Sequence, residues 1–557
     1  MPSKNTKSLS ALFAGAFLAA GCGSGGGSRD AGTPDNSWLQ LTPSSVDVSV
    51  VAGIPQNFTV TAKSNKTISQ AFNVGIVDKT GLIDPVVNIT TKNPSEYIAT
   101  LKVANTLQPG SYSTRLEVRL CEDDPSICAK PIQGSPWYVP LNVAVKSANN
   151  LTPLSDLPNG RAWQGIGGSI AHAAFVPGSF DPAKFSTRFL RTFNSENRFL
   201  MDDLTIENGV VYMSVMDIQS VSEMKGPELY AVDEATNNIK WSSQVWSPQL
   251  SQLHSLKTAP VIIGDQLYVG VQSYTAAFRT FNKATGASDG TLFEVGGNYA
   301  SYVGIQAHSG GLLVSGGSDG LKRVNTNTFQ VDWTAKAYYP ASPTADADNV
   351  YLFDKEYLSV VRASDGALLA APFITSSQCR TSAIHATDGH GNLYGVCYGS
   401  DRLDPFSRFN PDVGSELHAI DTLSKQPKWS VTGPYSPSVA LGATTLYALK
   451  TGVLEARDVN DGKLLWWINL LTGPDALREA QTVLLTENLV FVSSKAPTLG
   501  EIGKTVAVDL TTHKVVWSYP HGGKMAISSK GVLYIGGDQN YSAGGAQPAI
   551  IAAINLR

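Results

Sequence analysis

One short segment recurs along the chain with a fixed internal spacing. It has alternating apolar residues that end in Asp, and a Trp follows eight positions after that Asp. Four copies keep both residues, and a fifth has Asn325 in the Asp position: Asp233 and Trp241, Asn325 and Trp333, Asp421 and Trp429, Asp458 and Trp466, Asp509 and Trp517. The offset of eight positions from Asp or Asn to Trp is the same in all five copies, whereas most of the side chains between these two residues differ. This indicates a repeated structural unit, and such a repeat decides the fold of the whole region.

The residues around each copy predict four short antiparallel strands, which is the size of one β-propeller blade. In the first copy the strands end near residue 206, near residue 215, at Asp233 and at Trp241, and Asn-Gly type turns separate them. Seven such units reach Trp517, and an eighth with three strands runs from residue 524 to the end of the chain. Residues 188–193 are well placed to supply its fourth strand and close the ring. We therefore expect eight blades, with seven as the alternative.

Three positions of the repeat have an expected structural role. The small Ala two residues before the Asp allows close packing of neighbouring blades. The Asp side chain can accept hydrogen bonds in the turn that follows it. The Trp, buried between blades with its N–H satisfied, would lock one blade to the next.

The repeat resembles that of pyrroloquinoline-quinone (PQQ)-type propellers, and residues 162–177 resemble the segment that precedes those propellers. The resemblance implies fold more than activity, because function depends on a site and not on a fold. Quinone-dependent enzymes of this type hold the cofactor with Ca²⁺ at the central axis, and many have adjacent cysteines beneath the quinone. This chain has no adjacent Cys pair and no recognisable Asp base with Glu and Asn ligands, so no catalytic residue, metal or cofactor is predicted.

Residues 37–148 predict a separate all-β domain before the propeller at 149–557. About seven segments alternate apolar and polar residues and are separated by Gly, Pro and Asn turns, which fits an immunoglobulin (Ig)-like β-sandwich. The predicted fold class is therefore all-β, with a sandwich followed by a propeller of four-stranded antiparallel sheets.

The first 36 residues predict export and a lipid anchor. Two lysines precede an apolar run over 9–20, which is too short to span a bilayer and suits a signal peptide at 1–21. The Leu-Ala-Ala-Gly-Cys ending resembles the lipobox of bacterial lipoproteins, which implies cleavage before Cys22 and its acylation; an ordinary signal peptide is the alternative. Residues 22–36 form a Gly/Ser-rich tether. Because Gly23 rather than Asp follows the acylated cysteine, the sorting rule of enteric bacteria favours the outer membrane, on its periplasmic or surface face.

The cysteine count agrees with an exported protein. Four cysteines remain if Cys22 carries lipid, and the simplest arrangement is two local disulfides, Cys121–Cys128 and Cys379–Cys397. Four cysteines allow three pairings, so the connectivity stays open. A metal site is the minor alternative, because no Cys-x-x-Cys is present.

Two groups that could bind metal by residue type are better explained as turns. Asp388 and His390 belong to an Asp-Gly-His-Gly segment between two predicted strands, and His385 lies just before it. Asp346 and Asp348 imitate part of a calcium loop but lack its downstream Glu.

The sequence therefore favours a lipid-anchored envelope protein that acts as a non-catalytic scaffold for other envelope proteins, and we expect it to be a monomer. The formal net charge of −4 predicts no general attraction to nucleic acid. In architecture the predicted protein is similar to the lipoprotein B family of the β-barrel assembly machinery. Two alternatives remain: a periplasmic quinoprotein-type dehydrogenase, and a surface adhesin or glycan-binding protein.

Overall fold

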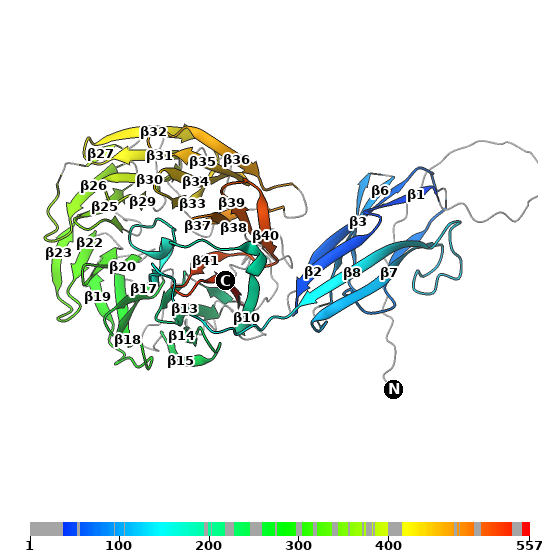
Figure 1. Ribbon diagram of the computed structural model, residues 1–557, viewed down its shortest axis with the longest axis horizontal. Coiled ribbons are helices and arrows are strands. Elements are labelled where there is room, and N and C mark those ends of the chain that lie inside the picture. Colours follow the sequence, from blue (N-terminus) through cyan, green and yellow to red (C-terminus); the bar gives the residue numbers. More distant parts are fainter. Residues whose placement is uncertain are drawn as a thin grey trace, which may run out of the picture. The chain divides into compact units, whose positions relative to one another are not determined.

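The protein consists almost entirely of β-strands, as a computed structural model shows (Figure 1). The structure describes residues 37–557 except 53–55, 69, 94, 105, 194–198, 202, 218–227, 246–258, 273–275, 297–303, 316–319, 337–342, 355–356, 370–371, 375–380, 383–384, 399–414, 473–475, 478–479, 495–502 and 537–548. The predicted signal peptide, the tether with Cys22, and Cys379 lie outside the described residues. Within the described part, no helix combines the length and apolar character needed to cross a bilayer.

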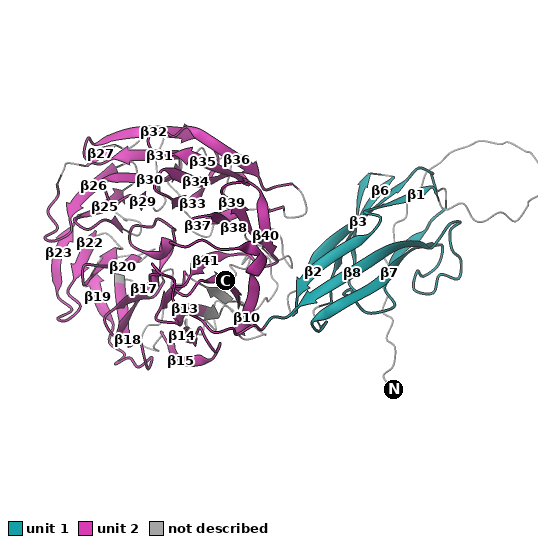
Figure 2. Ribbon diagram, viewed as in Figure 1, with its two compact units in different colours: residues 1–148 teal, residues 149–557 magenta. Residues whose placement is uncertain are grey.

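The chain forms two compact units, which meet in sequence between Ala148 and Asn149 (Figure 2). Unit 1 contains two four-stranded sheets. Their strand orders are β1 (Leu39–Thr42), β3 (Asn57–Ser64), β6 (Glu96–Lys102), β5 (Asn88–Asn93), and β2 (Val46–Val51), β8 (Trp137–Lys146), β7 (Gly110–Cys121), β4 (Asn73–Val77). The strand β1 was not among the segments predicted from the sequence, although its four residues alternate between apolar and polar.

The sheets of unit 1 pack face to face. Every second residue of β8 is buried, from Trp137 to Val145, while the residues between are exposed. Leu101 of the first sheet and Leu141 of the second are both fully buried in one core. The rings of Trp38 and Trp137 meet edge to face in that core, with their centroids 4.9 Å apart. Unit 1 is therefore a β-sandwich; its assignment to the Ig-like class stays a prediction.

Unit 2 is a β-propeller, and we number its sheets as blades in chain order (Figure 1). Among the described residues, the first four blades contain these strands: blade 1, β12 (Thr205–Glu207), β13 (Val210–Asp217), β14 (Glu228–Asp233), β15 (Ile239–Gln244), with β9 (Trp163–Gln164) and β11 (Phe199–Met201) added; blade 2, β16 (Val261–Ile263), β17 (Gln266–Gln272), β18 (Ala276–Asn282), β19 (Phe293–Gly296); blade 3, β20 (Gly304–His308), β21 (Gly311–Ser315), β22 (Leu321–Val324), β23 (Val331–Ala335); blade 4, β24 (Thr344–Ala345), β25 (Asn349–Asp354), β26 (Tyr357–Arg362), β27 (Phe373–Ile374).

The other four blades complete the described ring. Their strands are: blade 5, β28 (Thr381–Ser382), β29 (Ala386–Thr387), β30 (Asn392–Tyr398), β31 (Ser415–Asp421), β32 (Gln426–Thr432); blade 6, β33 (Tyr435–Leu441), β34 (Thr445–Lys450), β35 (Val453–Asp458), β36 (Leu464–Asn469); blade 7, β37 (Ala480–Leu485), β38 (Leu489–Ser494), β39 (Thr505–Asp509), β40 (Val515–Tyr519); blade 8, β41 (Lys524–Ile527), β42 (Val532–Gly536), β43 (Ala549–Asn555), β10 (Ser186–Phe193). Two short 3₁₀ turns, at Ile166–Gly168 and Pro182–Lys184, lie before β10.

Blade 8 joins the two ends of the propeller. Its outer strand β10 comes from the start of unit 2 and pairs antiparallel with β43 at the end of the chain. Arg188 of β10 is almost fully buried, and its guanidinium donates to the carbonyl oxygens of Thr152, Glu234 and Ala235 and to the side chain of Asn555. One side chain therefore connects blade 8 to the β14–β15 turn of blade 1. The pairing of residues 188–193 with the last strands was predicted from the sequence.

The segment over residues 170–176 binds the inner strands of four consecutive blades. The carbonyl oxygens of Ile170, Ala171, Ala173 and Ala174 accept backbone hydrogen bonds from Ala345 of blade 4, Thr387 of blade 5, Leu441 of blade 6 and Leu485 of blade 7. Each blade thus contributes one backbone donor to the same strap, which we call the axial strap. It is the segment that the sequence resemblance assigned to the approach to the propeller.

Hydroxyl groups on the inner strands also connect neighbouring blades. Thr205 donates to the carbonyl oxygen of Pro260, Thr344 to His385, Ser436 to Ala480 and Thr482 to Gly523. Each bond runs from one blade to the start of the next. The inner ring is therefore fixed by hydrogen bonds as well as by apolar packing.

Candidate functional site

The conserved spacing of the repeat produces a tight turn and a contact with the next blade. Asp233 Oδ1 accepts from the backbone N–H of Thr236, and Asp509 Oδ1 accepts from Thr511 and Thr512. Asp421 and Asp458 make the same kind of bond within their turns. The side chain thus satisfies backbone donors that the turn leaves without a strand partner.

The Trp of the repeat reaches the following blade. The indole N–H of Trp241, Trp333 and Trp429 donates to the carbonyl oxygens of Lys283, Ala363 and Val459, at 3.1, 3.1 and 3.0 Å. In each case a positive-φ glycine of the next blade lies against the indole ring. Those glycines are Gly286, Gly366 and Gly462, and a Cβ at any of them would lie 2.4 to 2.7 Å from the ring.

Two blade interfaces use other residues for the same contact. His513 replaces the glycine in blade 7, and its ring stacks on Trp466 with centroids 4.4 Å apart. Phe293 replaces the Trp in blade 2 and stacks on Phe329 of blade 3 at 4.1 Å. Trp517 has no indole hydrogen bond among the described contacts, and its ring packs edge-on against Phe185. These residues are consistent with a structural role between blades.

The outer strand of blade 6 has an unusual surface. In the other four Trp-containing outer strands, the residue after the Trp is Ser242, Thr334, Ser430 or Ser518, and all four are exposed. The same position on β36 holds Trp467, which is 58% exposed. Leu465, two residues earlier on the same side of the strand, is 49% exposed, whereas blades 1, 3 and 5 have Lys240, Asp332 and Lys428 there. We call Leu465 and Trp467 the β36 patch.

The β36 patch lies on a sheet edge. In the strand order of blade 6, β36 is the last strand, and among the described residues it pairs with β35 alone. Polar and charged side chains usually protect such edges from other chains. At these two positions blades 1, 3 and 5 have polar or charged side chains, whereas β36 has apolar ones, so its side chains are available for contact with a partner.

A buried polar cluster lies between blades 4 and 5. His385 and His418 are fully buried, and their Nε2 atoms are 2.7 Å apart. Phe353 of blade 4 stacks on the ring of His385 at 3.9 Å, and a Cβ on Gly395 of blade 5 would lie 2.4 Å from the same ring. The absence of a side chain at Gly395 therefore makes room for this histidine.

The cluster contains a set of possible metal ligands. Glu416 Oε1 lies 3.7 Å from His418 Nδ1, and Cys397 pairs with Glu416 in the β30–β31 ladder. Ligand atoms of Cys397, Glu416 and His418 all lie within 4.8 Å of one another, and all three residues are buried. Cys397 is disulfide-bonded. Its predicted partner, Cys379, lies outside the described residues, so that pairing stays a prediction.

A series of hydrogen bonds connects this cluster to a further buried histidine, His172. Thr344 Oγ1 donates to the carbonyl oxygen of His385 and also contacts His172 Nδ1, while the other ring nitrogen of His172 faces Gln306 Nε2. Because the threonine proton is already used, His172 donates from Nδ1 and accepts from Gln306. Burial lowers the pKa of His172 from 6.5 to about 4. This histidine is therefore neutral in the folded protein at neutral pH.

The cluster of Cys397, Glu416 and His418 was not predicted from the sequence, where His385 was grouped with Asp388 and His390 instead. The structure separates those three residues: His385 is buried, whereas Asp388 accepts from the backbone N–H groups of His390 and Asn392 in an exposed turn. Asp346 likewise accepts from Asp348 and Asn349 in a turn. The usable signal was the alternation in β31, which places Glu416 and His418 on the same side of one strand.

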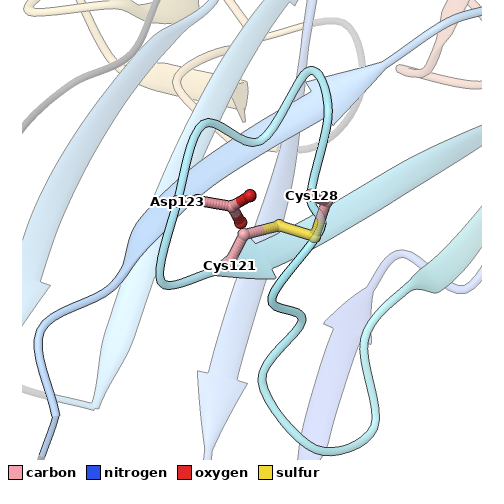
Figure 3. A group of neighbouring side chains, drawn as sticks. All are labelled: Cys121, Asp123 and Cys128. Atoms are coloured by element: carbon pink, nitrogen blue, oxygen red, sulfur yellow. A yellow bond between two sulfur atoms is a disulfide. The ribbon is translucent and has the colours of Figure 1, made fainter.

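The disulfide of unit 1 closes a small loop (Figure 3). Cys121 and Cys128 are bonded, with their Cα atoms 5.4 Å apart. The nearby Asp123 accepts from the backbone N–H groups of Ala129 and Lys130. Although these three residues lie close enough together to suggest a metal site, the sulfurs are bonded to each other and the carboxylate holds the loop.

The described residues do not supply the donor set that Ca²⁺ and a quinone would require. Ca²⁺ takes six to eight oxygen ligands. The described residues offer two groups of at least three clustered ligand side chains, and each includes cysteine. A quinone–Ca²⁺ site therefore does not fit this part of the chain, and no step is derived through that cofactor.

The fold and the repeat define this chain as a protein with a PQQ-like β-propeller. Residues 391–554 match the family model described as "Outer membrane protein assembly factor BamB". That match runs from strand β30 of blade 5 into strand β43 of blade 8. No curated protein matched the sequence.

Solved structures with similar folds come from two functional classes. BamB from Moraxella catarrhalis is 11% identical, with a TM-score of 0.46, and the alignment covers 67% of this chain and 98% of that one. The quinohemoprotein alcohol dehydrogenase ADHIIG from Pseudomonas putida HK5 is also 11% identical, with a TM-score of 0.39 and coverage of 72% and 80%. At this identity the likeness concerns the fold alone.

Proposed function

We propose that this protein is a lipid-anchored scaffold of the cell envelope that binds another envelope protein along the outer edge of blade 6. The observation that carries the proposal is the β36 patch. Leu465 and Trp467 stand at positions where the other Trp-containing repeats have mostly charged or hydroxyl side chains. Only Val516 of blade 7 shares the apolar character.

Physical chemistry supports an interface at this edge. Trp is enriched among residues that dominate binding energies, because its large ring excludes water from the partner contact. An open strand edge also offers unpaired backbone donors and acceptors, which an extended segment of a partner can use. The β36 patch combines both features on one strand.

The anchoring and location belong to the same proposal. The resemblance of residues 18–22 to a lipobox supports acylation of Cys22, and the family match to an outer-membrane assembly factor supports an outer-membrane location. Other envelope proteins are the proposed partners, and the lipid anchor is the proposed contact with the membrane. The Ig-like sandwich would serve as a spacer.

Site-specific crosslinking tests the interface. A photo-reactive amino acid is placed at Trp467 in the acylated full chain, and the matched control places it at Ser242, the same repeat position in blade 1. We expect a discrete crosslinked protein from position 467 in membranes and none from position 242. Equal crosslinking at both positions would contradict the proposed edge.

A second experiment replaces the β36 patch with the residues of blade 5. The double variant Leu465→Lys and Trp467→Ser copies Lys428 and Ser430. Because both side chains are about half exposed, we expect the melting temperature to change little and partner capture to fall at least tenfold. Capture that survives this change would place the interface elsewhere.

A dehydrogenase remains the second candidate function, since a quinohemoprotein is among the similar structures. Dye-linked oxidation of alcohols or sugars after addition of quinone and Ca²⁺ would support it and contradict a purely non-catalytic scaffold. An adhesin is the third candidate, and protease treatment of intact cells tests it, because a surface protein would be cleaved.

A further inference from the structure

We propose that Cys397, Glu416 and His418 form a redox-controlled site for a zinc-class divalent ion. The site is closed while Cys397 is disulfide-bonded and becomes available when a dithiol reductant opens that disulfide. The proposal rests on the buried cluster between blades 4 and 5 and does not depend on the β36 patch.

The three side chains have the chemistry and spacing for this class of metal. Thiolate, imidazole and carboxylate are the usual zinc ligands, and three protein ligands leave a fourth position for water. Two ligands on one tetrahedral zinc are about 3.4 Å apart, given Zn–N and Zn–O bonds of about 2.1 Å. The observed distance from Glu416 Oε1 to His418 Nδ1 is 3.7 Å, so little movement would be needed.

His385 supplies the support that a metal-binding histidine usually has. A histidine that binds metal through one ring nitrogen typically donates from the other, which fixes its tautomer and orientation. His418 faces Glu416 with Nδ1 and His385 with Nε2, at 2.7 Å. Stacking on Phe353 and the space at Gly395 hold His385 in place. His385 is therefore a positioning residue for the proposed ligand His418.

The oxidation state of Cys397 controls the site because a disulfide sulfur is not a thiolate, and the thiolate is the metal ligand. In the opening step, a dithiol transfers two electrons and two protons to the disulfide. The S–S bond of the protein breaks, two cysteine thiols form, and the dithiol becomes a disulfide. When the ion binds, the Cys397 thiol releases its proton to water and a metal–sulfur bond forms.

Cobalt titration of the full chain tests the proposal. The background carries Cys121→Ser and Cys128→Ser, which remove the other disulfide and leave Cys397 unchanged. We expect no Co²⁺ binding to the oxidised protein. After reduction with a phosphine we expect one bound equivalent, with a sulfur-to-cobalt charge-transfer band in the near ultraviolet. One tightly bound equivalent in the oxidised protein, or a reduced protein without that band, would overturn the proposal.

Two variants test the roles of one ligand and of the residue that positions another. Glu416→Gln keeps the shape of the side chain and should weaken Co²⁺ binding at least tenfold, while His385→Gln should weaken it by about 10- to 100-fold as a supporting residue. His390→Gln, in the exposed turn, is the matched control and should have no effect. Circular dichroism and the melting temperature verify that each variant is folded. Unchanged affinity in the folded Glu416→Gln protein would contradict the site.

Discussion

At the scale of single residues, the blade interfaces depend on pairs of residues, a Trp from one blade and a glycine from the next. Trp241 needs a neighbour without a side chain, and Gly286 of the next blade provides it. Its positive φ of 71° also favours glycine. The same arrangement recurs with Gly366 and Gly462. A single methyl group at these positions is therefore expected to have a much larger effect than its size suggests.

Gly286→Ala should destabilise the propeller strongly, because the new Cβ would lie 2.4 Å from the indole of Trp241. We expect a loss of about 2–4 kcal/mol in the free energy of unfolding, from overpacking and from backbone strain. Urea denaturation measures it. Gly264→Ala is the matched control: its φ is 60°, but nothing lies within 4 Å, so only the smaller cost of strain remains. Equal losses in the two variants would show that the indole contact does not matter.

His172 predicts a dependence of stability on pH. Its pKa is about 4 in the folded protein and about 6.5 when unfolded. Below pH 6.5 the unfolded chain therefore binds more protons, and stability falls as the pH decreases towards 4. For this histidine we expect a loss of about 2 kcal/mol between pH 7 and pH 5. His521, whose pKa burial also lowers to about 4, adds a similar loss.

The variant His172→Gln tests this assignment. Denaturation at pH 7 and pH 5 should show a smaller decrease in stability than in the original protein, by about 2 kcal/mol. His390→Gln, which changes an exposed turn, should keep the original decrease. If His172→Gln keeps it as well, another group is responsible for the acid sensitivity.

At the scale of elements, each blade is held to the next by a turn and an outer strand. Trp429 of blade 5 is buried and donates to blade 6, so Trp429→Ala should cost about 3–5 kcal/mol. A double-mutant cycle with Gly462→Ala measures the coupling. Because the clash at Gly462 involves this ring, Gly462→Ala should cost less in the Trp429→Ala background. Additive losses would indicate independent roles.

The elements that the sequence predicted are those whose signals are local. The strand alternation and the Asp-to-Trp spacing lie within about 20 residues, and they gave the blades and the closing segment at 188–193. The contacts of the Trp residues could not be read in the same way, because Gly286 lies in the blade after Trp241. One usable signal was missed: Gly462 follows Asp458 by four positions, as Gly286 follows Asn282.

The buried cluster was harder to predict for a different reason. Cys397, Glu416 and His418 meet only when the β30–β31 register is known, since it places Cys397 opposite Glu416. His385 comes from the start of another strand and reaches the cluster because Gly395 has no side chain. Residue type and spacing alone instead drew attention to the turn at Asp388 and His390.

At the scale of the whole molecule, the ring depends on its closing blade. Removing β43 by ending the chain at residue 548 would leave β10 without its partner strand and would expose the edge of β42 that now pairs with β43. We expect such a protein to aggregate, because two strand edges become exposed. Size-exclusion chromatography measures this outcome. A monomeric, cooperatively folded product would show that closure is dispensable.

A substitution of Arg188 tests the closure of the ring without removing a strand. Replacing this arginine with Met removes donors to four acceptors and leaves Glu234, whose pKa burial raises, with the charge of Lys530 but without that of Arg188. We expect a loss of roughly 3–5 kcal/mol in denaturant unfolding. Arg362→Met, at an exposed ion pair with Asp365, should cost less than about 1 kcal/mol.

The position of β10 also determines when the ring can be completed. Its residues 186–193 are synthesised long before residues 549–555, which form its partner strand. The axial strap is likewise made before any of the four blades that bind it. Each segment therefore keeps its hydrogen-bonding groups exposed until its own partner strands have been made, which for β10 means the last strand of the chain. Such long-range pairing is slow to form, so the protein is most dependent on chaperones during the interval before its final residues are synthesised.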